Sequence, residues 1–143
     1  MEYNKPTSIL FDTSYIISST LWKDSNYHSA GNYIAKVDTF EKKYITNYIF
    51  LEIATVSSQK LGKLESNRLL QGFLGSNIEM IWIDKLLDKK IQLEFLKLKD
   101  KNISYVDLST SIIAKINKIS AVATFDKHFK KLGEKYGFEV VGV

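Results

Sequence analysis

The segment SILFDTS, residues 8–14, sets a short apolar run directly before a carboxylate and two hydroxyls. The run from Ser8 to Phe11 carries no charge, which is compatible with a strand buried on both faces of a parallel sheet. Asp12 then lies at the carboxyl end of that strand, where open α/β sheets bind their ligands. Asp is also a favoured N-cap residue, so Asp12 is equally explained as the start of a helix from Thr13 onward.

Outside this segment, strand-like runs alternate with stretches of helical spacing. Further short apolar runs predict strands at residues 44–46, 79–83, 121–124 and 138–141. Helical spacing covers residues 27–43, 47–60, 64–73, 85–99 and 104–118, with a short helix or turn at 128–136. Strands separated by helices predict right-handed parallel crossovers and an α/β sandwich, formed by a single domain over residues 1–143.

The composition excludes several classes of protein. Hydrophobic residues make up 45% of the chain and charged residues 25%, as in globular domains. Without cysteine, disulfides, thiolate metal sites and cysteine nucleophiles are excluded. No apolar run approaches the roughly 18–20 residues that span a bilayer, and the N-terminal residues lack a signal-peptide pattern, so we expect a cytoplasmic protein without membrane contact. The net charge of +4 favours a polyanionic partner, although a lysine-rich composition also follows from an AT-rich genome.

Glu52 lies on the inward face of the helix predicted at residues 47–60. It follows Ile49 by three residues and precedes Val56 by four, and these two residues with Ile53 define the predicted buried stripe. A carboxylate that points inward needs a partner charge, a metal ion or a proton. A structural ion pair is therefore the alternative to a functional site.

Asp107 and Asp126 lie where a predicted helix begins and where a predicted strand ends. Asp107 follows Ser104 at the spacing of a helix capping box. Asp126 comes just after the strand at residues 121–124, in a position that also suits a turn or cap aspartate. Capping therefore explains each residue as well as function does when each is taken alone.

Four acids, Asp12, Glu52, Asp107 and Asp126, are expected at the same edge of the sheet. Two carboxylates about 6 Å apart repel by roughly 3 kcal/mol at an effective dielectric near 20. Four converging acids would therefore destabilise the fold unless cations lie between them. Ligands that are all oxygen favour Mg²⁺ or Mn²⁺ over zinc, and no nearby set of histidines argues otherwise.

The motifs around these acids resemble those of the PIN domain family. The acidic motifs in order are FDTS at residues 11–14, TNYIFLE at 46–52, SYVD at 104–107 and TFDKHF at 124–129, the last followed by LG at 132–133. Residues 24–30 are similar to the early helix start of VapC-type members. Each motif alone is weak, whereas all four in this order over residues 8–141 make a specific pattern.

The resemblance implies a PIN-like three-layer sandwich with a central, mainly parallel sheet, and a hydrolase that cleaves RNA with Mg²⁺ or Mn²⁺. It makes the four acids both catalytic residues and metal ligands. It also adds Ser14 and Thr124 as polar residues that assist the site, where the alternatives are a first-turn helix hydroxyl and a strand-end threonine. Many short members are toxins of toxin–antitoxin pairs, so a cognate antitoxin and a homodimer are implied as well.

Other interpretations remain open on the sequence. The same fold is compatible with a nuclease that acts on DNA or in RNA processing, and with a non-catalytic RNA- or protein-binding module. A receiver-like phosphoacceptor also places acids at strand ends, but only Asp12 follows the first strand. His28 and His128 are expected to be surface or capping residues. Four lysines near Asp126 could contact RNA phosphates or form a solvated helix face: Lys127, Lys130, Lys131 and Lys135.

Overall fold

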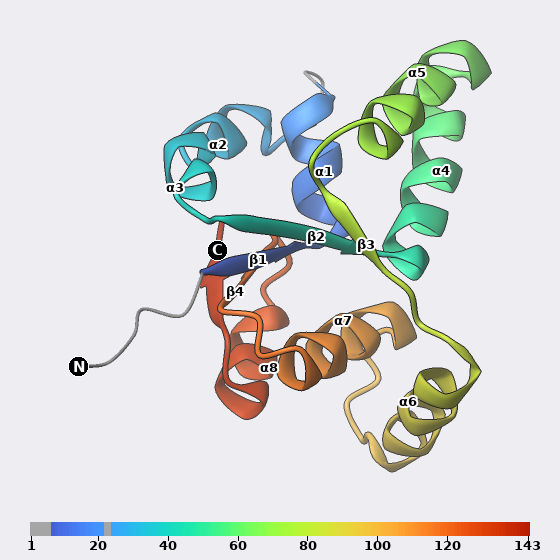
Figure 1. Cartoon of the computed structure of the whole chain (residues 1–143), viewed down its shortest axis with the longest axis vertical. Coiled ribbons are helices and arrows are strands. Elements are labelled where there is room, and N and C mark those ends of the chain that lie inside the picture. The colour runs from blue at the N-terminus through green and yellow to red at the C-terminus, as the bar shows by residue number, and fades with distance from the viewer. Residues whose placement is uncertain (1–6, 22–23) are drawn as a thin grey trace.

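The computed structural model describes residues 7–21 and 24–143, which form a three-layer sandwich (Figure 1). The central layer is a five-stranded sheet in the order β3-β2-β1-β4-β5, and every neighbouring pair is parallel. Its strands are β1 (Ser8–Phe11), β2 (Lys42–Thr46), β3 (Glu79–Ile81), β4 (Ala121–Ala123) and β5 (Glu139–Val141). The predicted parallel α/β sandwich is confirmed.

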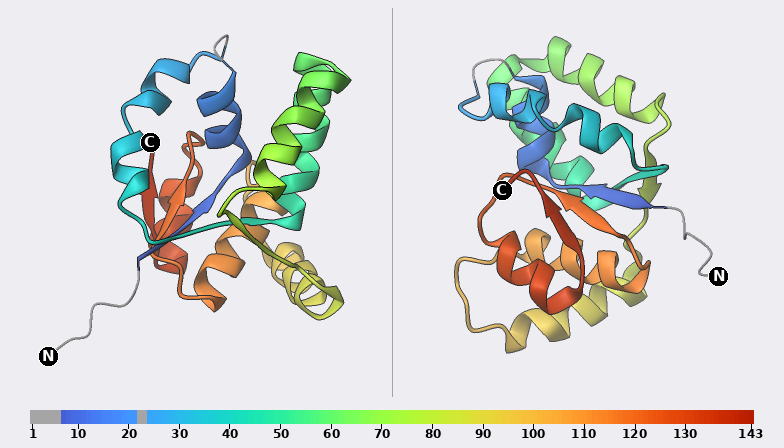
Figure 2. Two further views of the ribbon diagram at one scale, coloured as in Figure 1. Left: turned by 45° about the horizontal axis from the view of Figure 1, so that its top comes forward. Right: turned by 90° about the vertical axis from the view of Figure 1, so that its left-hand side faces the viewer.

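Helices cover both faces of the sheet (Figures 1 and 2). One face carries α1 (Thr13–Thr20), α2 (Tyr27–Gly31), α3 (Ile34–Asp38), α4 (Asn47–Leu61) and α5 (Lys63–Leu74). The other face carries α6 (Lys85–Lys97), α7 (Tyr105–Ile116) and α8 (Phe129–Tyr136). Among the described residues, no helix is both long and apolar enough to cross a membrane.

The first strand lies at the centre of the sheet because both of its faces are apolar. Ile9 and Phe11 belong to the core on the α1–α5 side, whereas Leu10 belongs to the core on the α6–α8 side. All three side chains are buried. Full burial of an aliphatic or aromatic side chain is worth roughly 1.5–3 kcal/mol, so the segment that opens the domain also holds its two cores together.

The direction in which the chain adds strands across the sheet reverses between β1 and β4. From β1 it proceeds to β2 and β3, and the α6–α7 connection then returns it to the other side of β1. The helices that follow β1 and β4 leave toward opposite faces (Figure 2). In open α/β sheets a crevice lies outside the carboxyl ends of the strands at such a point, and here residues after both strands line a pocket. Phe11 pairs with Ala123, and the Asp12 amide donates to the Ala123 carbonyl at 2.9 Å. Asp12 and Thr124 therefore emerge side by side.

The single helix predicted over residues 27–43 is wrong. The chain forms two short helices, α2 and α3, and β2 begins at Lys42 instead of Tyr44. After Gly31, the amides of Asn32 and Tyr33 bond to carbonyls three residues back, and this tight turn ends α2.

The buried stripe of α4 also differs from the prediction. Ile49 and Ile53 are buried as expected, but the third buried residue is Ser57. Val56 is half-buried and lies with Glu52 on the side of the helix that faces the crevice. The other predicted helices and strands are found, with ends that shift by at most two residues.

Candidate active site

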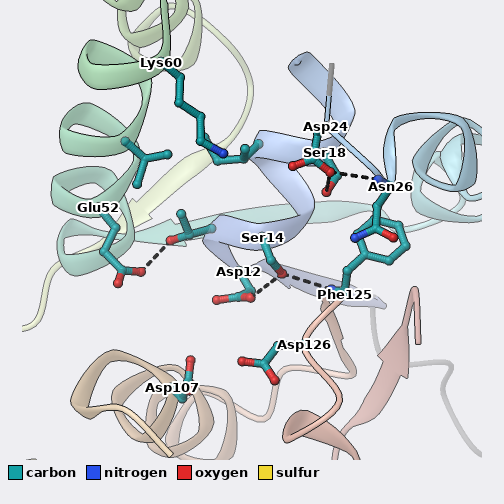
Figure 3. A pocket seen from close by; sticks show the side chains of 13 residues that line it. Asp12, Ser14, Ser18, Asp24, Asn26, Glu52, Lys60, Asp107, Phe125 and Asp126 are labelled. Atoms are coloured by element: carbon teal, nitrogen blue, oxygen red, sulfur yellow. Dashed lines mark hydrogen bonds between the residues drawn. The ribbon is translucent and has the colours of Figure 1, made fainter. Parts of the chain in front are cut away.

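A pocket of about 380 Å³ opens at the carboxyl ends of β1 and β4, and four carboxylates point toward it (Figure 3). They belong to Asp12 after β1, Glu52 in α4, Asp107 in the first turn of α7 and Asp126 after β4. The structure thus brings all four predicted acids to one pocket, although they come from four separate segments. Their roles as metal ligands and catalytic residues stay predictions.

Asp12 is held by two hydroxyls rather than by a helix cap. It occupies the N-cap position of α1, but its side chain makes no capping hydrogen bond. Its Oδ2 accepts hydrogen bonds from Ser14 Oγ at 2.7 Å and from Thr124 Oγ1 at 2.8 Å. The amides of Phe125 and Asp126 donate in turn to these two hydroxyls, at 3.0 Å each. Ser14 and Thr124 therefore lie at the predicted site and position Asp12.

Glu52 is positioned by a neutral partner. Thr13 Oγ1 donates to Glu52 Oε1 at 2.6 Å, which links the first residue of α1 to α4. No ion pair with Glu52 occurs in the described part of the chain. The structural ion pair that the sequence left open is therefore not found there, and the charge of Glu52 remains directed at the pocket.

Asp107 and Asp126 cap backbone amides and line the pocket as well. Asp107 completes a capping box, because its Oδ2 accepts from the Ser104 amide at 3.1 Å while its own amide donates to Ser104 Oγ at 3.0 Å. Asp126 Oδ1 accepts from the amide of His128 at 2.9 Å, ahead of α8. Capping and pocket lining are therefore not exclusive for these two residues.

One pattern unites the four acids. In each, one carboxylate oxygen accepts hydrogen bonds, and the other has no hydrogen-bond donor among residues 7–21 and 24–143. The bonded oxygen fixes the side chain, and the second oxygen keeps its lone pairs for another partner. The four acids of the pocket therefore provide four carboxylate oxygens for which the described residues supply no hydrogen-bond donor.

Burial and mutual repulsion disfavour the charged forms of the two innermost acids. The pKa of Asp12 is raised to about 6, mainly by burial and also by the charges of Asp107 and Glu52, against the lowering effect of its two hydroxyl partners. Burial also raises the pKa of Asp107, and the neighbouring charges of Asp126 and Glu52 act in the same direction. A bound cation would reverse these effects.

The donor set suits a divalent cation that prefers oxygen. Asp24 and Asn26 add side-chain oxygens to the pocket lining, so among the described residues five acids line it against one lysine. Oxygen ligands of this kind select Mg²⁺, Mn²⁺ or Ca²⁺. Within the described ranges, however, no three His, Asp or Glu side chains lie close enough together to form a complete ligand set. Side-chain movement would therefore be needed for three carboxylates to meet on one ion.

Sequence reasoning missed Lys60 and assigned no role to Thr13 or Phe125. Lys60 lines the pocket from α4 and points into it (Figure 3). It lies two helical turns after Glu52, so this spacing could have identified it. Phe125 also lines the pocket, and its ring stacks on Tyr15 at 5.6 Å between centroids.

The histidines and the lysine cluster lie outside the pocket lining. His28 is exposed, and His128 is the half-buried N-cap residue of α8. The four lysines of the predicted cluster are all exposed: Lys127, Lys130, Lys131 and Lys135. Neither group lines the acidic pocket, in keeping with the surface roles predicted for the histidines.

Known proteins with the same fold include a bacterial toxin. The sequence matches the family described as PIN domain over residues 9–135. The structure is similar to VapC20 of Mycobacterium tuberculosis, a Sarcin-Ricin loop cleaving toxin, with a TM-score of 0.79 and 17% identity over 87% of this chain and 95% of that chain. It is also similar to FitAcB of Neisseria gonorrhoeae, with a TM-score of 0.60 and 21% identity over 93% of this chain and 96% of the other.

A third similar structure is FitAB bound to an IR36 DNA fragment, with a TM-score of 0.60 and 21% identity over 92% of each chain. No curated protein sequence matches the chain. At these low identities, the likeness to solved structures establishes the fold and does not transfer a substrate.

Proposed function

The chain belongs to the PIN domain family, and from this premise and its acidic pocket we propose that it is a metal-dependent endoribonuclease. One observation carries the proposal. Four carboxylates from four segments line one pocket, at the point where the sheet reverses its strand order, and each keeps one oxygen without a hydrogen-bond donor in the described part of the chain. This arrangement costs stability unless a cation is bound, and phosphate is the anion that such a cation recruits.

Asp12, Glu52, Asp107 and Asp126 are the residues that would hold Mg²⁺ or Mn²⁺. When bound, the ion neutralises the scissile phosphate and lowers the pKa of an attacking water. Ser14 and Thr124 keep the free oxygen of Asp12 directed into the pocket, and Thr13 does the same for Glu52. These hydroxyl hydrogen bonds matter because the positions of metal ligands depend on the groups that hold them.

Lys60 is the positively charged residue found in the pocket lining among the described residues. Its flexible side chain reaches inward from α4 (Figure 3), where it can pair with a phosphate oxygen next to the cleaved bond. Asp12 or Asp107 positions the attacking water, because both carboxylates line the pocket in which the ion would be held. Hydrolysis by this route yields 5′-phosphate and 3′-hydroxyl ends.

Purified protein tests this proposal on matched RNA and DNA oligonucleotides with Mg²⁺, Mn²⁺ or EDTA. We expect RNA cleavage that needs the ion and is lost in Asp107→Asn and Glu52→Gln. Asp38→Asn and Glu134→Gln change exposed acids outside the pocket and serve as matched controls. Cleavage in EDTA, or ends with 2′,3′-cyclic phosphate, would contradict the proposal. Cleavage of DNA alone would favour a DNA nuclease, and RNA binding without cleavage would favour a non-catalytic module.

We further propose that the protein is a cytoplasmic toxin that dimerises and is inhibited by a cognate antitoxin. The similarity to a toxin that cleaves RNA supports this role. Exposed leucines supply apolar surface for protein partners, since Leu51, Leu64 and Leu74 on the α4–α5 pair are each at least 66% exposed. A neighbouring gene for a small DNA-binding protein would supply the candidate antitoxin.

Growth assays and light scattering test these roles separately. Induced wild-type protein should arrest growth, Asp12→Asn should not, and co-expression of the neighbouring protein should restore growth. A molar mass of twice the 16.4 kDa chain would establish the dimer. Equal growth with wild-type protein and Asp12→Asn would contradict the toxin role without affecting the nuclease proposal.

A further inference from the structure

A second pocket adjoins the acidic one. Its volume is about 400 Å³, which lies in the range of roughly 300–1,000 Å³ found for small-molecule sites. Glu52 lines both pockets, so they share a border. Tyr48 lies one turn before Glu52 on α4, and Tyr105 lies two residues before Asp107 on α7. Each tyrosine therefore flanks one of the predicted metal ligands.

Asp88 of α6 holds this second pocket together. Its Oδ1 accepts from the Tyr48 hydroxyl at 2.6 Å and from the Tyr105 hydroxyl at 2.5 Å. Gln92 Nε2 donates to Oδ2 at 3.0 Å. A carboxylate has about four acceptor positions, so one position remains on Oδ2. These hydroxyl contacts lower the pKa of Asp88, which keeps it a charged acceptor at neutral pH.

The pocket combines flat apolar walls with a polar end. The rings of Tyr48 and Tyr105 lie 6.3 Å apart, and Phe95 packs edge-on against Tyr105 at 5.3 Å. Leu51 and Val106 complete the apolar lining, and Leu51 is exposed. If the hydrogen bonds of Asp88 served only to join α4, α6 and α7, no open pocket would be needed beside them.

We propose that this second pocket binds one unpaired base of the RNA substrate, next to the cleaved bond, and prefers bases that carry an amino group. The proposal rests on the endoribonuclease function proposed above. Tyr48 and Glu52 are four residues apart, which corresponds to a rise of roughly 6 Å along α4, or about one nucleotide step of a single strand. A strand with its phosphate at the acidic pocket therefore reaches the second pocket with its neighbouring base.

The chemistry of the pocket matches a base better than a phosphate. Tyrosine faces stack on bases of any sequence, whereas the charge of Asp88 repels phosphate. Carboxylate oxygens accept from amino groups such as N4 of cytosine, and Gln92 retains a carbonyl oxygen for a second contact. Uracil carries no amino group, so it should fit least well.

Sequencing of cleavage ends tests the proposal. Wild-type protein is incubated with Mn²⁺ and a pool of single-stranded and hairpin-loop RNAs that carry randomised positions, and nucleotide frequencies are counted around each cut. We expect uracil to be depleted at one position beside the cut, by roughly fivefold or more. Asp88→Asn should shift the preference at that position toward uracil, because the new amide can donate to its carbonyl oxygens.

Gln92→Ala should reduce the same preference without affecting folding, since Gln92 is exposed. Gln71→Ala and Asp38→Asn make the same changes outside both pockets and should leave the preference unchanged. Active variants with wild-type frequencies at every position would overturn the second pocket as a base site and leave the nuclease proposal standing. A wild-type protein that cuts none of these RNAs would overturn both.

Discussion

Replacing Asp12 by asparagine should stabilise the metal-free protein at neutral pH, although it removes a residue central to the proposed site. Asp12 is only 4% exposed, and burial is the main reason that its pKa rises from 3.8 to about 6. Asparagine has nearly the same shape and can still accept the hydrogen bonds of Ser14 and Thr124 through its Oδ1. The substitution therefore removes mainly the buried charge.

The magnitude follows from the two pKa values of Asp12. The folded protein binds the Asp12 proton about 2 pKa units more tightly than the unfolded chain, which corresponds to about 3 kcal/mol. Because the folded pKa is raised, this cost is almost absent below pH 4, develops as pH rises from about 4 to 6, and is complete above that. The stability of Asp12→Asn relative to wild type should therefore increase by about 2–3 kcal/mol between pH 4 and pH 8.

Urea unfolding in EDTA at several pH values between 4 and 8 measures this difference directly. Asp38→Asn, at an exposed position, controls for the general effect of losing a negative charge. Mg²⁺ or Mn²⁺ added at pH 8 should raise the stability of wild type by about 2.7 kcal/mol at a concentration 100 times Kd, and that of Asp12→Asn much less. A stability difference that does not change with pH would refute the buried, repelled charge on which the site argument depends.

Three further changes probe other parts of the molecule. Lys60→Met should raise KM for RNA without unfolding the domain, because it removes one phosphate contact. The slope of log KM against log salt concentration should fall by roughly 0.7–1. An unchanged slope would count against that contact. Ser14→Ala removes one hydrogen bond to the Asp12 carboxylate, so the rate of RNA cleavage should fall roughly tenfold. The acidic limb of the pH–rate profile should also move to higher pH. An acidic limb that does not move would argue against the role of Ser14 in holding Asp12. Gly133→Ala should destabilise the fold by about 1–3 kcal/mol in urea unfolding, because the new Cβ would lie 2.8 Å from the Phe138 carbonyl oxygen. The control Gly72→Ala places its Cβ in open space and should stabilise the fold by about 0.5–1 kcal/mol. Equal effects of the two substitutions would contradict the close packing of α8 on the chain before β5.

The sequence predicts the four acids because each lies next to an element boundary. Strand ends and helix starts can be located from apolar periodicity, and parallel strands bring such boundaries to one edge. The sequence cannot decide between capping and function at Asp107, because the choice depends on which carboxylate oxygen is used. In the structure, Oδ2 accepts the cap hydrogen bond while Oδ1 has no donor among the described residues, so capping leaves one oxygen available for the predicted role.

Features that depend on contacts between distant helices were not predictable. Tyr48, Asp88 and Tyr105 belong to three helices, and no spacing within one helix indicates that their side chains meet. Lys60 was overlooked for a different reason, since an exposed lysine is unremarkable in a lysine-rich chain. The break between α2 and α3 was missed because apolar spacing continues across it while the backbone forms a tight turn.

The partners of the acids argue that the negative charge of this pocket has been retained for a purpose. A fold that needed these carboxylates only for stability could neutralise them with lysine or arginine, yet the contacts found for them come from hydroxyls and backbone amides. Such donors hold a carboxylate in place without removing its charge. They offset part of the cost of burial and leave the remaining oxygens available. The position of the pocket makes this possible, because the chain emerging from β1 and β4 supplies hydroxyls and free amides at the point where the helices diverge. The attraction for a cation that we propose is therefore a direct consequence of how the strand ends are built.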